Sequence, residues 1–454
     1  MKRKLVLLFT ALFFSGLAAN AQHDMQHMHM GTDSMQHATD TGKPAMDMNM
    51  DMGDMSMPMG HAYSLHLPMN RNGSGTGWLP DASPMYGYMF MSKKWMYMLH
   101  GSIYPRYGRQ DVSHQGVRGG EKWDAPNWFM FMGQTKVGKK GLFSFSSMFS
   151  LDALIGGNHG YPLLFQTGES YKGQPLVDYQ HPHDLFSELS VAYTYSFNEK
   201  SDLTFYFGYP GEPALGSVAF MHRPSAAYDP DAPLSHHWND GTHITFGVAT
   251  IGYRYDKWKL EVSSFTGREP DEHRYNFDRM RFDSYSGRLS FAPSENWSLQ
   301  VSHGYIKGPE DLHPDENVHR TTASAIYSKP LGDTRQLDVT ALWGLNKVKD
   351  HDGENAALLE AALRLQKWAL YTRYEFVQKD VEELNLEGSF PHDAVFPVNA
   401  LTLGFNRDIL NVGHMRVAAG AQATGYAADN RLNNLYGKNP WSGEVFLRIY
   451  PGKM

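Results

Sequence analysis

The chain has 454 residues, no cysteine and a formal net charge of −7 at pH 7. Without cysteine it has neither disulfides nor thiolate metal ligands, and its acidic balance argues against a nucleic-acid partner. Aromatic residues make up 13% of the chain, and almost no segment repeats apolar residues at helical spacing, so the composition favours an all-β protein.

The first 21 residues have the features of a secretory signal peptide. Lys2, Arg3 and Lys4 precede a short apolar run over 5–14, and Ala19-Asn20-Ala21 provides the small-x-small pattern of a cleavage site. The run is too short for a membrane-spanning helix, which needs about 20 residues. We therefore expect 1–21 to be removed on export, with an uncleaved anchor as the alternative.

Residues 22–69 form a methionine- and histidine-rich arm, with 12 methionines and six histidines in 48 residues. Gly, Asp and Pro interrupt it throughout and it has no periodic apolar face, so we predict that it is disordered. Thioether sulfur binds Cu(I) or Ag(I), whereas imidazole accepts Cu(II), Ni(II) or Zn(II). The excess of methionine over histidine favours the soft ions; a nickel or zinc tail and an incidental low-complexity tail are the alternatives. The predicted ligands of the arm are Met46, Met48, Met50, Met52, Met55, Met57, Met59, His23, His27 and His29.

Residues 70–95 are predicted to link the arm to a barrel that occupies 96–454, with 86–91 compatible with one extra strand. The barrel pattern is alternation at period two, as in 189–197 (LSVAYTYSF), where apolar or aromatic residues alternate with Ser, Ala and Thr. A transmembrane β-barrel requires this alternation, because lipid lies outside its wall and water inside. Sixteen strands are predicted, with 14 as the alternative, near 96–106, 127–137, 141–152, 185–197, 202–209, 243–255, 258–266, 282–292, 296–306, 319–329, 334–345, 355–366, 367–378, 398–408, 414–425 and 441–450.

The connections between these strands alternate strictly between short and long. Transmembrane barrels have short periplasmic turns and long extracellular loops, so the rhythm supports an antiparallel up-and-down barrel over a soluble propeller or sandwich. The same alternation places a set of acids and bases on the inner face. They are Glu188, Glu261, Glu360, Glu375 and Glu444, with Arg288, Arg364, Arg373, Arg416 and Arg448.

Two resemblances follow from these segments. The Met/His-rich arm before a barrel resembles the outer-membrane copper-resistance protein B family, which implies a role in copper handling. The barrel resembles a largely uncharacterised family of bacterial outer-membrane β-barrel proteins, which implies the fold. The strings that carry the second resemblance are DASPM (81–85), YPLLFQTGE (161–169), QHPHDLF (180–186), HRPS (222–225), HHWNDGTH (236–243) and GREPDE (267–272).

Two long loops contain a second set of candidate metal ligands. By strand order, only one strand separates the end of one loop from the end of the other, so the loop ends are expected on the order of 10 Å apart. The imidazoles are then expected to share either a metal ion or hydrogen bonds with Asp178, Asp184 and Asp240. The predicted group is His181, His183, Asp184, His236, His237 and His243.

The sequence therefore predicts an outer-membrane barrel that handles Cu(I) or Ag(I) through a periplasmic arm and passes it through the pore. Its expected partners are outer-membrane lipid, metal ions and periplasmic metal-handling proteins. The alternative is a general diffusion pore or structural barrel with an incidental tail. No enzymatic activity is expected, because the chain lacks a Gly-x-Ser-x-Gly motif and nothing identifies a nucleophile to act with His183 and Asp184.

Overall fold

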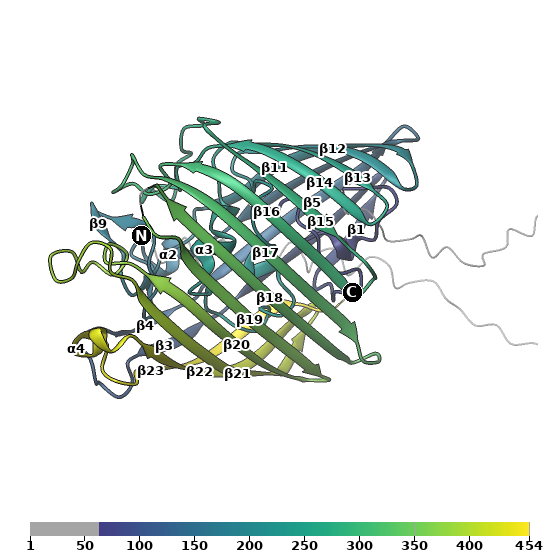
Figure 1. The fold of residues 1–454 in the computed structure, drawn as a ribbon. Helices are drawn as coiled ribbons and strands as arrows, with labels where there is room; N and C mark the ends of the chain where they lie inside the picture. Colours follow the sequence, from purple (N-terminus) through teal and green to yellow (C-terminus); the bar gives the residue numbers. More distant parts are fainter. Residues whose placement is uncertain (1–62, 350, 454) are drawn as a thin grey trace, which may run out of the picture. The chain divides into compact units, whose positions relative to one another are not determined.

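The computed structural model describes residues 63–349 and 351–453, which all belong to the compact unit Met57–Met454. In this unit the described strands form a closed antiparallel barrel of sixteen wall strands (Figure 1). The wall strands are β2 (Trp95–Ile103) continued by β3 (Arg106–Gln110), β4 (Gly120–Asp124) continued by β5 (Asn127–Val137), β6 (Gly141–Phe149), β11 (Phe186–Asn198), β12 (Ser201–Gly208), β13 (Val248–Tyr255), β14 (Trp258–Phe265), β15 (Ser284–Phe291), β16 (Trp297–Lys307), β17 (Asn317–Pro330), β18 (Arg335–Val348), β19 (Glu354–Leu365), β20 (Trp368–Lys379), β21 (Phe396–Val412), β22 (Met415–Ala428) and β23 (Trp441–Pro451).

All sixteen predicted strands are present, and the alternative of 14 is wrong. The barrel closes where Gly443–Phe446 of β23 pair with 106–109 of β3 and Ile449 pairs with Ile103 of β2. Each of the first two wall strands is interrupted next to a proline. Pro105 lies between β2 and β3, and Pro126 lies between β4 and β5. Proline has no N–H to donate to the ladder, so the pairing is broken there.

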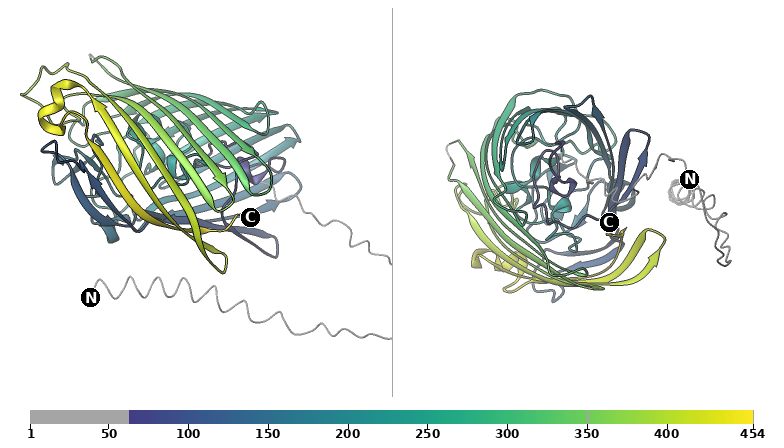
Figure 2. Two further views of the ribbon diagram at one scale, coloured as in Figure 1. Left: turned by 90° about the horizontal axis from the view of Figure 1, so that it is seen from below. Right: turned by 90° about the vertical axis from the view of Figure 1, so that its right-hand side faces the viewer.

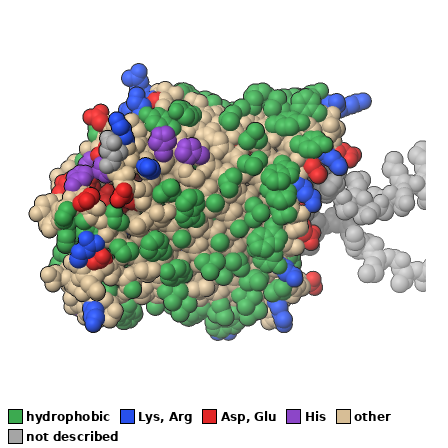
Figure 3. All heavy atoms as spheres, viewed as in Figure 1, with side chains coloured by type: hydrophobic (Ala, Val, Ile, Leu, Met, Phe, Trp, Pro, Cys, Tyr) green, Lys and Arg blue, Asp and Glu red, His purple; other side chains and the backbone are tan. Residues whose placement is uncertain are grey.

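The two faces of the wall differ in chemistry, as β14 illustrates. Trp258, Leu260 and Val262 are exposed on the outer face, whereas Lys259 and Glu261 are buried on the inner face. Apolar side chains spread widely over the outer surface (Figure 3). Aromatic pairs on neighbouring strands lie near the short turns, including Trp258 with Phe291 and Trp297 with Tyr327. An apolar outer band bordered by aromatic rings is typical of transmembrane barrels.

The remaining described elements are short and lie in the connections or at the start of the chain. No helix among residues 63–349 and 351–453 is long and apolar enough to cross a bilayer. These elements are η1 (Met69–Arg71), β1 (Tyr88–Ser92), α2 (Asp152–Gly156), β7 (Tyr161–Pro162), β8 (Ser170–Tyr171), β9 (Gln174–Pro175), β10 (Tyr179–Gln180), η2 (Phe220–His222), α3 (His236–Asn239), η3 (Gly241–His243), η4 (Asn430–Leu432) and α4 (Asn433–Tyr436).

Residues 63–87 lie inside the barrel, near the short turns. The Ser298 hydroxyl donates to the Trp78 carbonyl at 2.9 Å, and the Ala82 amide donates to the Glu295 carbonyl at 2.9 Å. Residues 70–95, which we expected to be a linker, therefore pack against the inner wall over 71–82 and pair with β2 as β1. Buried polar groups of the inner wall need hydrogen-bond partners, and this segment supplies them.

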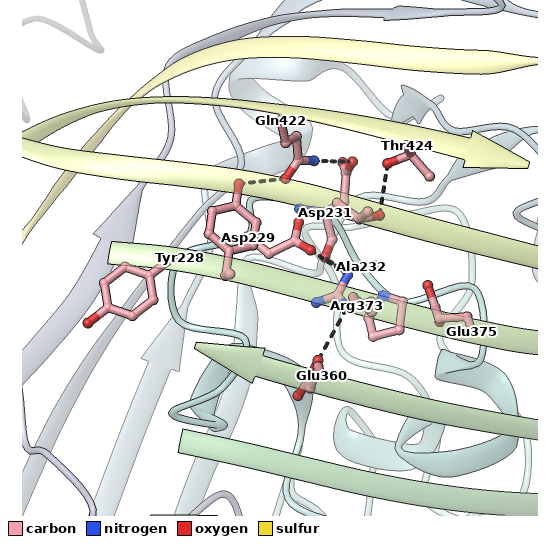
Figure 4. Close-up of polar contacts among 12 residues, drawn as sticks. Tyr228, Asp229, Asp231, Ala232, Glu360, Arg373, Glu375, Gln422 and Thr424 are labelled. Carbon is pink, nitrogen blue, oxygen red and sulfur yellow. Dashed lines mark hydrogen bonds and ion pairs between the residues drawn. The ribbon is translucent and has the colours of Figure 1, made fainter. Parts of the chain in front are cut away.

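The long connection 209–247 between β12 and β13 also folds into the lumen, and almost all of it is buried. Viewed along the barrel, chain segments cross the interior (Figure 2). Asp229 forms an ion pair with Arg373 on β20 at 3.0 Å, and Asp231 forms one with Arg106 at 2.6 Å. Gln422 of β22 donates to Asp231 at 2.9 Å, so the connection is anchored to several wall strands (Figure 4).

Candidate metal centre in the lumen

Five buried histidines from two long connections meet inside the barrel. His181 and His183 immediately precede β11, His236 and His237 lie on α3, and His243 lies in η3. The ring centroids are 5.1 Å apart for His236 and His237, 5.0 Å for His236 and His243, 5.5 Å for His183 and His243, and 5.6 Å for His181 and His237. We call these five residues the histidine cluster.

One nitrogen of each ring, Nδ1, lies next to an oxygen acceptor. His183 Nδ1 lies 2.8 Å from Asp152 Oδ2, and His236 Nδ1 lies 2.8 Å from Asp240 Oδ1. His243 Nδ1 donates to the Asp240 carbonyl at 2.9 Å. The two remaining Nδ1 atoms are close to carboxylates, at 3.1 Å from Glu169 for His181 and 3.5 Å from Glu269 for His237.

The other nitrogen, Nε2, is left without a partner in most of these rings. Among the described residues, the Nε2 atoms of His181, His183, His237 and His243 are buried and have no hydrogen-bond partner. In His183, His236 and His243, donation from Nδ1 to an oxygen fixes the tautomer that leaves a lone pair on Nε2, and this is the usual arrangement of metal-binding histidines. His181 Nδ1 lies near Glu169 but, like its Nε2, has no hydrogen-bond partner among the described residues. The donor set therefore fits a transition-metal ion.

The geometry allows at least three of the rings to share one ion. His181, His236 and His237 each place one nitrogen within 4.8 Å of the other two. Metal–nitrogen bonds of about 2.0–2.1 Å would require these nitrogens to move closer to one another.

The electrostatic environment favours the neutral form of three of these imidazoles, those of His181, His236 and His243. Burial lowers the pKa of His181 well below its ordinary value, and the Arg274 guanidinium lowers it further. Burial also lowers the pKa values of His236 and His243. Neutral imidazole is the form that binds metal, so these three rings favour coordination at neutral pH.

The structure brings together only part of the predicted loop group. The five histidines meet, but Asp184 forms an ion pair with Arg274 at 3.3 Å. Asp178 accepts from the Phe165 amide at 2.7 Å and from the Tyr436 hydroxyl, so it does not support the histidines. Of the three aspartates expected to hydrogen-bond the imidazoles, Asp240 does so, to His236 and His243. His183 contacts Asp152 instead.

Three carboxylates that support the histidines were not anticipated. Glu169 is the last residue of the string YPLLFQTGE, and Glu269 lies within the string GREPDE. Asp152 is the first residue of α2. Their location in distinctive loop strings was the available signal, but no spacing relates them to a particular histidine. The predicted ligands of the arm, from His23 to Met59, lie outside the described residues.

No protein-family model matches the chain, and no curated protein matches it in sequence. Its fold is similar to that of OmpF of Salmonella typhi in complex with daunomycin, with 10% identity, 80% of this chain and 100% of that chain covered, and a TM-score of 0.50. An anion-selective porin from Comamonas acidovorans matches with 9% identity, coverages of 78% and 99%, and a TM-score of 0.48. OprB of Pseudomonas putida matches with 10% identity, coverages of 78% and 94%, and a TM-score of 0.46.

These likenesses concern the fold alone. Together with the closed wall and its apolar outer face, the similarity to OmpF defines the fold class as a transmembrane β-barrel of the outer-membrane type. The comparisons do not support the resemblance of the arm to the copper-resistance protein B family.

Proposed function

We propose that the protein is an outer-membrane barrel that binds a transition-metal ion in its lumen at the histidine cluster. The observation that carries this proposal is the set of four buried Nε2 atoms without hydrogen-bond partners among the described residues. Two of these rings, His183 and His243, hydrogen-bond through Nδ1 to an oxygen, and the other two have Nδ1 near a carboxylate. Leaving a buried polar atom unsatisfied costs about 1–3 kcal/mol. A shared metal ion would remove this cost for each Nε2 atom that it binds, and none of the four has a hydrogen-bond partner among the described residues.

The class of metal follows from the ligands. Neutral imidazoles with carboxylates behind them suit Cu(II), Zn(II) or Ni(II). We further propose that the arm lies in the periplasm and adds a soft-metal site for Cu(I) or Ag(I), as its methionine content predicts. Periplasmic metal-handling proteins are the expected partners of such an arm.

A second candidate function is general diffusion of small solutes, and the similarity to OmpF favours it. The connection 209–247 and residues 63–87 occupy the lumen, and this argues against a wide pore. A pore of this kind passes only small solutes unless the connection moves. The two functions are compatible, because a metal ion bound to α3 and η3 would hold the connection 209–247 in place.

Metal counting on the full chain in detergent micelles tests the histidine cluster. After dialysis, we expect the double variant His181→Ala with His237→Ala to hold fewer Zn(II) ions than the wild type, with a difference of about one ion per chain. The matched control is His303→Ala with His319→Ala, because these two rings are 5.7 Å apart on the exposed outer face of β16 and β17. All three proteins carry the same arm, so the difference reports on the cluster. Equal zinc content in the three proteins, each with the same thermal unfolding profile, would refute the proposal.

A further inference from the structure

Nine methionines gather on the inner wall beside β1, β2, β5 and β6. Residues 63–453 contain 12 methionines, so most of them belong to this one group. We call it the methionine cluster. Its buried members are Met69, Met98, Met130, Met132 and Met148, and its partly buried members are Met85, Met89, Met96 and Met221.

The strand register explains how the wall residues come together. Met98 of β2 pairs with Met132 of β5, and Met130 of β5 pairs with Met148 of β6. Directly paired residues lie on the same face of a sheet, with their side chains adjacent. Because Met98, Met130, Met132 and Met148 are all buried, that face is the inner one, and it presents a continuous row of thioethers across three strands.

Four methionines of the cluster line one small cavity. Met69, Met96, Met98 and Met132 line a space of about 10 Å³, together with Gln134. The Gln134 amide nitrogen lies 3.9 Å from the sulfur of Met69 and 3.9 Å from that of Met96. The sulfurs of Met69 and Met96 therefore both lie beside one polar group at this cavity.

Two histidines lie at the edge of the cluster. His100 pairs directly with Met130, and its Nε2 is buried without a hydrogen-bond partner among the described residues. Its ring lies 5.8 Å from that of His222, next to Met221. Burial lowers the pKa of His222 to about 3, and His100 lowers it further, so this imidazole is neutral.

Methionine is also a common filler of irregular apolar space. Filling alone does not explain this group, because it combines an unpaired imidazole nitrogen with a cavity lined by four thioethers. Thioether sulfur is a soft, uncharged ligand that selects Cu(I) over divalent ions. We propose that the methionine cluster is a binding site for a soft monovalent cation, Cu(I) or Ag(I), inside the barrel.

This site is distinct from the histidine cluster. Different residues of η2 contact the two clusters: Met221 packs on the methionines, and the ring centroid of Phe220 lies 5.4 Å from that of His236. The proposal does not depend on the metal proposed for the histidines, because the ligand type and the preferred ion are different.

Silver titration of the full chain tests the site, since Ag(I) is a soft ion that needs no reductant. We expect the variant Met98→Leu with Met132→Leu to bind about one Ag(I) per chain less than the wild type, because leucine has similar volume but no sulfur. The matched control is Met280→Leu with Met415→Leu, whose methionines lie outside the cluster. In the wild type with labelled methionine methyl groups, Ag(I) should shift the NMR signals that the Met98 and Met132 substitutions remove.

Three results separate the possibilities. The proposal would be wrong if both variants bind the same amount of Ag(I) and if Ag(I) shifts only the NMR signals of methionines outside the methionine cluster. The ion would then be assigned to the arm. The His181→Ala with His237→Ala variant should keep the silver-dependent shifts of Met98 and Met132, which distinguishes this site from the histidine cluster. Zn(II) should leave these two signals unchanged, and an equal shift with Zn(II) would contradict selectivity for soft ions.

Discussion

Asp240 accepts hydrogen bonds from three neighbours in the lumen. Its carboxylate contacts His236 at 2.8 Å and Arg223 at 2.7 Å, and its backbone carbonyl accepts from His243 at 2.9 Å. Burial alone would raise the pKa of Asp240, but Arg223 and His236 hold it below its ordinary value. The charged carboxylate therefore orients one imidazole while it neutralises a buried arginine.

We predict that Asp240→Asn weakens zinc binding at the histidine cluster by about 10–100-fold, the usual effect of losing a residue that orients a ligand. Competition with a chromophoric chelator measures the affinity. Asp256→Asn, in an exposed short turn, is the matched control and should bind as the wild type does. The same affinity in both variants would show that Asp240 does not position the ligand.

The pH dependence of zinc binding is a second prediction at this scale. Protons compete with metal for imidazole only below its pKa, and burial lowers the pKa values of His181, His236 and His243. Zinc affinity should therefore stay constant from pH 7.5 to below pH 6.5, the ordinary pKa of histidine, and fall only at more acid pH. A decline centred near pH 6.5, measured by the same competition, would indicate solvent-exposed histidines instead.

Among the elements, the connection 209–247 has the largest effect on the lumen. Asp229 and Asp231 anchor it to Arg373 and Arg106, and both arginines are buried. Removing one partner of an isolated buried ion pair costs about 3–5 kcal/mol. The cost here is smaller, because Arg373 keeps Glu360 and Arg106 keeps Asp124 and Glu444. Losing both carboxylates should release the connection from the wall.

We therefore predict that Asp229→Asn with Asp231→Asn increases the single-channel conductance of the barrel in planar lipid bilayers and makes it noisier than that of the wild type. The control is Asp311→Asn, which removes the ion pair between Asp311 and Arg268. The Asp311 side chain is 71% exposed, so the conductance should not change. If the double variant conducts as the wild type does while remaining folded, the connection is not held by these two carboxylates.

For the whole molecule, the alternation of turn lengths determines the expected orientation in the membrane. We predict that Ser113→Cys, in an exposed long connection, reacts with a membrane-impermeant thiol reagent added to whole cells. Lys139→Cys, in an exposed short turn, should react only after the cells are opened. The natural chain has no cysteine, so labelling reports only on the introduced residue. Labelling in the reverse pattern would invert the orientation.

The sequence predicts the wall better than it predicts the lumen. Period-two alternation identifies strands such as β14, and strand order is enough to bring the five histidines together. It does not identify Asp152 as the partner of His183, 31 residues away, or place Trp78 beside Ser298, 220 residues away. Such contacts depend on the path of irregular segments, which have no periodicity. The methionine cluster was missed for a related reason, since β2, β5 and β6 meet only after their register is set.

The position of residues 63–87 inside the wall has a consequence for the order of assembly. Ser64 contacts Asp202, Trp78 contacts Ser298 and Ala82 contacts Gln336, at separations of 138, 220 and 254 residues. Tyr86 pairs with Lys453, so the first and last described parts of the barrel meet at the seam. Contacts of such long range form slowly. Residues 63–87 therefore gain these partners only once the later strands are present, so the inner wall and the segment that it encloses complete each other.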